Sequence, residues 1–102
     1  MKLLALLTPK VDCDRTAFAP LLVPEELALW APYRAGTLRE WYFQPDPMTI
    51  TFIYEAADPA AVERELDTLP MVKASLLDRQ IIVLGPWVPL EAIFDKTRMA
   101  AN

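Results

Sequence analysis

The stretch from residue 38 to residue 55 is typical of a β-hairpin whose strands carry large side chains on both faces. Its strands, LREWYF and MTITFIYE, are separated by QPDP, a stiff link that cannot continue either ladder. Successive residues of a strand point to opposite sides, so Leu38 and Tyr42 are predicted on one side. Trp41 and Phe43 are predicted on the other. Neither side is polar enough for water, so we expect both to be covered.

The segments before the hairpin predict one strand and one helix. Residues 3–7 form an apolar run that stops at Thr8-Pro9-Lys10, too short for a secretory signal, and we interpret it as a buried first strand. Residues 11–23 are interrupted by Pro20 and followed by Pro24, and are expected to be irregular or to form a single helical turn. A helix is predicted from Pro24 to about residue 35, with Gly36 as its left-handed cap. Pro32 within this helix predicts a kink.

The segments after the hairpin predict a second helix and a fourth strand. Asp58 followed by Pro59 is a typical helix start, and Pro70 is expected to end that helix. Residues 79–84 are predicted to form a strand that Gly85-Pro86 stops. Residues 89–96 are expected to form a short helix or docking arm.

The resulting order of strand, helix, strand, strand, helix, strand predicts an α+β protein with the ferredoxin-like βαββαβ arrangement. In that fold both helices cover one face of a four-stranded antiparallel sheet. Residues 81–84 are all apolar, so the uncovered face of the sheet is also apolar. We therefore expect two sheets to pack face to face in a homodimer, or in a higher homo-oligomer.

Composition excludes several classes of function. A chain of 102 residues is expected to form one domain, residues 1–102, with a C-terminal arm at about residues 88–102. The net charge of −4, without a basic block, argues against nucleic-acid binding. The chain has no histidine and a single cysteine, Cys13, so we expect no transition-metal site and no histidine-based triad. No stretch has the ~20 apolar residues of a membrane span, which predicts no membrane partner and a cytoplasmic location.

Three stretches of the chain resemble a known family. They are YRAGTLRE (residues 33–40), EAAD (residues 55–58), and LPMV with the later LGPW (residues 69–72 and 84–87). In them the chain resembles the dimeric α/β barrel superfamily and, within it, the muconolactone isomerases. The resemblance implies the fold described above and a proton transfer, without metal or cofactor, within a small lactone that carries a carboxylate. Residues 11–23 depart from the isomerase pattern, so any pocket wall formed there is expected to differ.

Such a proton transfer needs a base, a donor for the developing enolate oxygen and a cation for the carboxylate. Arg39 is the candidate cation, because its guanidinium can hold a carboxylate in bidentate fashion. Glu40 and Tyr42 share a strand face and are candidates for base and donor. Glu55, at the end of its strand, is a fourth catalytic candidate. The structural alternatives are an ion pair for Arg39, a core or interface position for Tyr42, a solvated Glu40, and a helix-cap or ion-pair role for Glu55.

Four aromatic residues are candidates for substrate binding: Trp30, Tyr33, Trp41 and Trp87. Together they can form a flat-sided apolar pocket for a ring, or else belong to the core. The leading hypothesis is a small isomerase-like enzyme acting on a carboxylated lactone or a cyclic carbonyl compound. The alternatives are a non-catalytic protein for ligand binding or assembly, and a cofactor-free monooxygenase or cyclase acting on a polyphenol.

Overall fold

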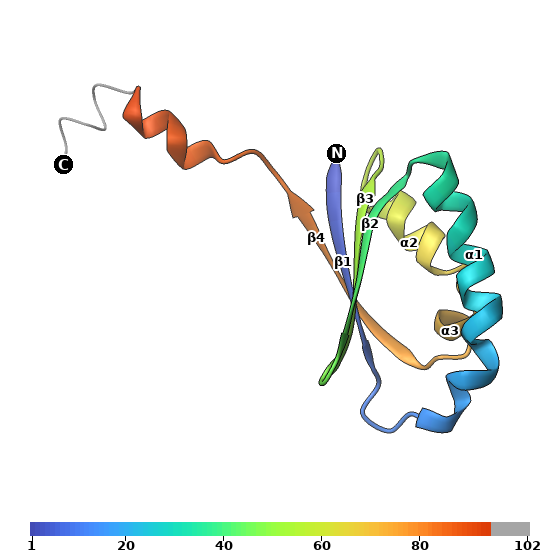
Figure 1. The fold of residues 1–102 in the computed structure, drawn as a ribbon. Helices are drawn as coiled ribbons and strands as arrows, with labels where there is room; N and C mark the ends of the chain where they lie inside the picture. Colours follow the sequence, from blue (N-terminus) through green and yellow to red (C-terminus); the bar gives the residue numbers. More distant parts are fainter. Residues whose placement is uncertain (95–102) are drawn as a thin grey trace.

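The computed structural model describes residues 1–94 as a four-stranded antiparallel sheet with its helices on one face (Figure 1). The strands are β1 (Lys2–Pro9), β2 (Leu38–Pro45), β3 (Met48–Glu55) and β4 (Leu77–Leu84), in the order β2-β3-β1-β4. The α-helices are α1 (Leu22–Ala35), α2 (Pro59–Leu66) and α3 (Pro70–Lys73), and shorter 3₁₀ helices span Arg15–Ala17, Ala19–Leu21 and Val88–Ile93. The predicted fold class is confirmed.

Helix α1 begins earlier than predicted and ends as predicted. It starts at Leu22 because the preceding 3₁₀ turn, Ala19–Leu21, leads directly into it, which leaves Pro24 in the first turn. Gly36 follows the helix with φ of 83°, and its N–H donates to the carbonyl of Tyr33. This is the predicted left-handed glycine cap. Pro32 lies within the helix, and the kink there stays a prediction.

Pro70 begins a helix instead of ending one, which corrects the prediction. Asp58 caps α2 as expected, with its Oδ1 accepting from the N–H of Ala61 at 2.8 Å. That helix ends at Leu66, and Pro70 takes the first position of the short helix α3, where a missing N–H costs nothing. The extra helix is important for the site because its second residue, Met71, reaches the pocket described below.

A β-bulge at Arg39 changes the predicted faces of the hairpin. Leu38 pairs with Tyr54, and the next paired residue, Glu40, faces Ile53, so Arg39 is an extra residue in the ladder. The bulge reverses the alternation, and Leu38 lies on the same face as Trp41 while Tyr42 lies on the opposite face. The prediction that Leu38 and Tyr42 share a face was therefore wrong. The turn is also shorter than expected, because β2 extends to Pro45, while β3 starts at Met48 as predicted.

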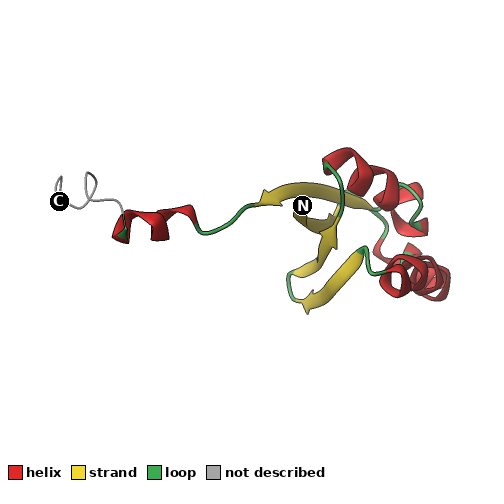
Figure 2. Cartoon of the chain, turned by 90° about the horizontal axis from the view of Figure 1, so that it is seen from above, coloured by secondary structure: helices red, strands yellow, loops and turns green. Residues whose placement is uncertain are grey.

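The two faces of the sheet differ in how they are covered. Against the helices lies a buried core whose members include Leu3, Ala5 and Leu7 of β1. The alternate residues of β1, Leu4 and Leu6, point to the other face and are half-buried by their neighbours in the sheet. Ile53, Ile82 and Leu84 share this second face. No helix covers this apolar surface in residues 1–94 (Figures 1 and 2).

Within the described residues, no helix has the length and apolar character to cross a membrane. The same part of the chain holds no group of three or more Cys, Asp or Glu residues arranged to bind a metal ion. The end of the predicted C-terminal arm, from Asp95 onward, lies outside the described residues.

Candidate functional site

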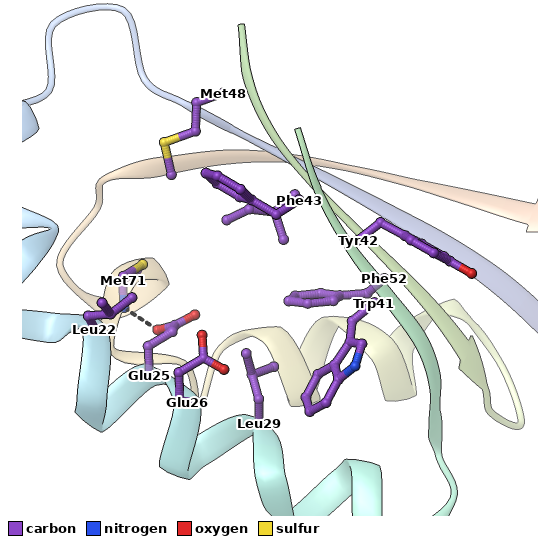
Figure 3. Close-up of a pocket in the computed structure, with 11 residues that line it drawn as sticks. Leu22, Glu25, Glu26, Leu29, Trp41, Tyr42, Phe43, Met48, Phe52 and Met71 are labelled. Atoms are coloured by element: carbon purple, nitrogen blue, oxygen red, sulfur yellow. Dashed lines mark hydrogen bonds between the residues drawn. The ribbon is translucent and has the colours of Figure 1, made fainter. Parts of the chain in front are cut away.

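A pocket of about 310 Å³ opens between α1 and the strands β2 and β3 (Figure 3). This volume is at the lower end of small-molecule sites and suits one ring. Its walls are mostly apolar: Leu22 and Leu29 from α1, Trp41 and Phe43 from β2, Met48, Ile50 and Phe52 from β3, and Met71 from α3. Tyr42 also lines it, and the polar side chains in the lining include Glu25 and Glu26.

Glu25 is the buried acidic group of this pocket. Only 4% of its surface is exposed, and it is the one charged residue among those buried in residues 1–94. Its Oε1 accepts a hydrogen bond from the backbone N–H of Met71 at 2.9 Å (Figure 3). That bond explains the position of the carboxyl group, because α3 begins at Pro70 and presents the N–H of its second residue toward α1.

The pKa of Glu25 is raised above its ordinary value, chiefly because burial disfavours the carboxylate. The bond from Met71 acts in the opposite direction, and the charge of Glu26 adds to the increase. A carboxyl group with a raised pKa in an apolar pocket is able to take up and return a proton. Among the described residues that line the pocket none is Lys or Arg, so no cation there neutralises Glu25.

The raised pKa makes folding depend on pH in a defined direction. A carboxyl group that holds its proton more tightly when folded stabilises the protein fully below its unfolded-state pKa. This contribution is lost as the pH rises through the folded-state pKa, because the folded protein must then bury a carboxylate. We expect the difference in free energy of unfolding, Glu25→Gln minus wild type, to increase as the pH rises from 5 to 8. Urea unfolding at several pH values measures this; a constant difference would contradict it.

Tyr54 is a second buried polar group of the helix-facing side. Its ring packs edge-on against Phe52 at 5.9 Å, and its hydroxyl is buried without a hydrogen-bond partner among the described residues. Burial, with the charges of Glu65 and Glu25, raises the pKa of this phenol, so the hydroxyl stays neutral. Tyr54 is not part of the pocket wall.

Removal of the unpaired Tyr54 hydroxyl should stabilise the protein. A buried donor without a partner costs about 1 kcal/mol or more, so Tyr54→Phe is expected to raise the free energy of unfolding by about 1 kcal/mol. Tyr42→Phe is the matched control, because the exposed Tyr42 hydroxyl donates to Oε1 of Glu40 at 2.7 Å. Chemical denaturation compares the two. A loss of stability in Tyr54→Phe would show that its hydroxyl has a partner.

The four predicted catalytic residues are not brought together in the pocket. Arg39 is exposed on the bulge, where its Nε donates to the carbonyl of Gly36. Glu40 lies on the uncovered face with the Tyr42 hydroxyl bonded to it, and this contact raises the pKa of that phenol. Tyr42 lines the pocket, but its ring and hydroxyl point away from it (Figure 3). Oε2 of Glu55 lies 3.5 Å from the amino group of Met1. This contact is the ion pair that was predicted as the structural alternative for Glu55.

The predicted aromatic residues are divided between two places. Trp41 lines the pocket, and Tyr33 stacks on it with ring centres 4.2 Å apart. Trp30 follows Tyr33 at 5.8 Å, so three of the four aromatic residues form one stack at the side of the pocket. Trp87 lies outside this stack, 76% exposed beyond the end of β4.

Sequence reasoning missed Glu25 as a functional candidate. In the sequence, Glu25 and Glu26 are first-turn acids of a helix, where negative charge is common. The start of α1 at Leu22 turns Glu25 inward, and α3 supplies its bonding partner. A signal was present in the spacing, because Leu22, Glu25 and Leu29 recur at three and four residues on one helix face.

No family model and no curated protein matches the sequence. Among solved structures, the chain is similar to 5-chloro-2-hydroxyhydroquinone dehydrochlorinase from Burkholderia phenoliruptrix AC1100, in its complex with 2,5-dihydroxybenzoquinone. The TM-score is 0.69 at 15% sequence identity, over 83% of this chain and 94% of that chain. This likeness supports the ferredoxin-like α+β fold described above. At this identity the likeness concerns the fold alone.

Proposed function

We propose that this dimeric α/β barrel protein is a small cofactor-independent enzyme that transfers a proton within a small cyclic carbonyl compound. The observation that carries the proposal is Glu25, a buried carboxyl group with a raised pKa on the wall of an apolar pocket. In this mechanism the Glu25 carboxylate removes a proton from the carbon next to the carbonyl and returns it at another position of the ring. The structural neighbour, a dehydrochlorinase captured with a quinone, supports small-molecule chemistry on this fold.

The pocket favours an uncharged ring over a carboxylated lactone. A substrate carboxylate needs a cation, and the predicted one, Arg39, is outside the pocket lining. Two acidic side chains, Glu25 and Glu26, would repel a carboxylate instead. Within the muconolactone isomerase analogy, we therefore favour the cyclic carbonyl substrate, with Trp41 and Phe52 as apolar contacts for the ring.

The buried carboxyl group also favours the proposed enzyme over the two alternative functions, a non-catalytic binding protein and a polyphenol oxygenase or cyclase. Burial of an acid in an apolar wall costs desolvation free energy, and we take acid–base chemistry as the function that offsets this cost. A polyphenol oxygenase or cyclase of the kind considered from sequence would place a cation beside the ring, and the described lining has none. Proton transfer is the reaction that uses a buried carboxyl group in an apolar pocket wall.

We also propose that the working unit is a homodimer in which two sheets meet through their uncovered faces. The half-buried Leu4, Leu6 and Ile82 supply the apolar surface that a second copy would cover. A cytoplasmic location, as predicted from the sequence, is kept as part of this proposal.

Hydrogen exchange at carbon tests the proposed reaction with simple ring compounds in place of the natural substrate. The protein is incubated in D₂O with a panel of small cyclic ketones, lactones and enones, and ¹H NMR follows the loss of signal from protons next to the carbonyl. We expect accelerated exchange for at least one uncharged ring and none for its carboxylated analogue. Binding of panel compounds, detected through aromatic fluorescence, without any exchange would contradict the proposal and favour the binding-protein alternative.

A further inference from the structure

Two aromatic rings at the end of the pocket form a parallel stack, and only one of them belongs to the pocket wall. Trp41 of β2 lines the pocket, whereas Tyr33 of α1 does not. Their ring centres are 4.2 Å apart, and their planes differ by only 9°. In a stack this parallel, the phenol ring covers one face of the indole. The indole therefore separates Tyr33 from the cavity, and Tyr33 can act on the cavity only through Trp41.

The other face of the Trp41 indole is turned toward the cavity. On α1, the residues that line the pocket run from Leu22 to Leu29, and Tyr33 follows Leu29 by one helical turn. Tyr33 thus covers the indole from the side of the helix C-terminus, while the cavity lies on the side of the helix N-terminus. Figure 3 shows the same order, with Trp41 at one end of the pocket and Leu22 and Met71 at the other. A ring bound in the pocket therefore meets the indole by its flat face.

Trp41 depends on Tyr33 because the sheet supports the indole on one side only. β2 is an edge strand, so its neighbour within the sheet is β3 alone. There Phe52 is the register partner of Trp41 and lines the same pocket. Tyr33 supplies the contact from outside the sheet, and the cap at the end of α1 holds it in place, because the Gly36 N–H donates to the Tyr33 carbonyl. Without the Tyr33 ring, the indole can turn into other rotamers.

Glu25 and the indole are placed to act on the same ring. Glu25 precedes Tyr33 by two helical turns, which is about 12 Å along the axis of α1. The indole stands 4.2 Å from Tyr33 on the side toward Glu25. The remaining space holds about one ring between the indole and the carboxyl group, in agreement with the pocket volume of about 310 Å³.

An unsaturated ring suits a flat wall better than a saturated ring in the proposed reaction. When the Glu25 carboxylate takes the proton, the C–H bond breaks, its electron pair forms a carbon–carbon double bond, and the negative charge moves to the carbonyl oxygen. The dienolate formed from a cyclic enone is flat over most of its ring, while the enolate of a saturated ketone keeps several puckered carbons. Contact with the indole therefore strengthens as an enone loses its proton, and binding of this kind raises the rate.

We propose that Tyr33 is a positioning residue, which holds the Trp41 indole as a flat wall on which the substrate ring stacks, and that the substrates are cyclic enones. This rests on the proposed function, with Glu25 as the base and an uncharged cyclic carbonyl compound as the substrate. Two of the aromatic residues expected from the sequence to bind substrate then have different roles. Trp41 contacts the ring, and Tyr33 acts through Trp41.

Binding of a flat and a puckered ring tests the wall without any reaction. Phenol and cyclohexanol have the same ring size and one hydroxyl group each, but only phenol is flat. The indole N–H signal of Trp41, assigned from its absence in Trp41→Leu, follows binding in ¹H–¹⁵N NMR titrations. We expect wild type to bind phenol roughly 10-fold more tightly than cyclohexanol, the size of one aromatic contact. This preference should fall to within about 2-fold in Tyr33→Leu and return in Tyr33→Phe, which keeps the stacked ring.

Catalysis provides a second measurement. In the hydrogen-exchange assay, Tyr33→Leu should lower kcat for cyclohexenone by roughly 10-fold with a smaller change in KM, because the contact with the indole strengthens as the ring flattens. The loss should be smaller for cyclohexanone, and Tyr33→Phe should restore the rate for cyclohexenone. General damage to the fold would instead lower both rates alike, and Tyr33→Phe would not separate from Tyr33→Leu in the same way.

The results that overturn the proposal are distinct from those that overturn the proposed function. Tyr33 is 39% exposed, so Tyr33→Leu should fold, and Tyr33→Gln is a second variant without the ring; circular dichroism verifies both. Equal binding of phenol and cyclohexanol to wild type, or an unchanged preference in the variants without the ring, contradicts the role of Tyr33 and leaves the proposed function intact. A preference for phenol that depends on Tyr33, without any exchange in cyclohexenone, contradicts the substrate class and the proposed reaction while the flat wall stands.

Discussion

Glu25→Gln should lower the rate of carbon-bound hydrogen exchange by roughly 10²- to 10⁴-fold, the usual contribution of a positioned general base. Glutamine has nearly the same shape and keeps an oxygen that can accept the bond from the Met71 N–H. The variant therefore removes the titrating group while it preserves the pocket. Exchange rates from NMR, at saturating substrate and at several pH values, measure the effect.

Glu26→Gln provides the matched control for this experiment. Glu26 is next to Glu25 and lines the same pocket, but its side chain is exposed. We expect it to keep most of the activity and to shift the pH profile toward lower pH, because its charge contributes to the raised pKa of Glu25. If Glu25→Gln kept the wild-type rate, the acid–base role of Glu25 would be wrong. If Glu26→Gln lost as much as Glu25→Gln, the base would have to be assigned to the pair.

Leu4→Arg should dissociate the proposed dimer, with an increase in the dissociation constant of roughly 10²- to 10³-fold. Leu4 lies between Ile53 and Ile82 on the uncovered face, so two arginines would be buried near each other in a symmetric contact. Ala60→Arg on the exposed side of α2 adds the same charge away from this face and should leave the dimer intact. Sedimentation equilibrium gives both constants, and circular dichroism verifies that each variant is folded. A folded Leu4→Arg dimer of normal affinity would place the contact on another surface.

The order of elements was predictable because each one has strong local signals. Gly36 after the first helix and Asp58 before the second marked a helix end and a helix start that the structure retains. Pro70 misled the prediction, since a proline after a helix and a proline that begins the next helix look alike in sequence. The bulge at Arg39 had no such signal, and it reversed the faces of Leu38 and Tyr42.

The candidate site was less predictable than the fold because its members come from separate parts of the chain. Trp41 and Tyr33 were expected beside the pocket and lie there, one in its wall and the other stacked on it. The catalytic candidates on β2 were predicted because they lie close together along one strand. The pocket is lined instead by residues from a helix and from strands that are distant in sequence. Glu25 meets Met71 across 46 positions of sequence, a contact that local patterns do not encode.

The sequence by itself determined the class of fold and the need for a cover on the second face of the sheet. Both follow from local physics: the periodicity of apolar residues, the caps, and the excess of apolar side chains in the hairpin. Only the tertiary structure decided which acid is buried, because burial of Glu25 depends on where α1 starts and on the N–H that α3 presents to it. A carboxyl group acquires its raised pKa from that environment, which exists only when the distant segments are packed together.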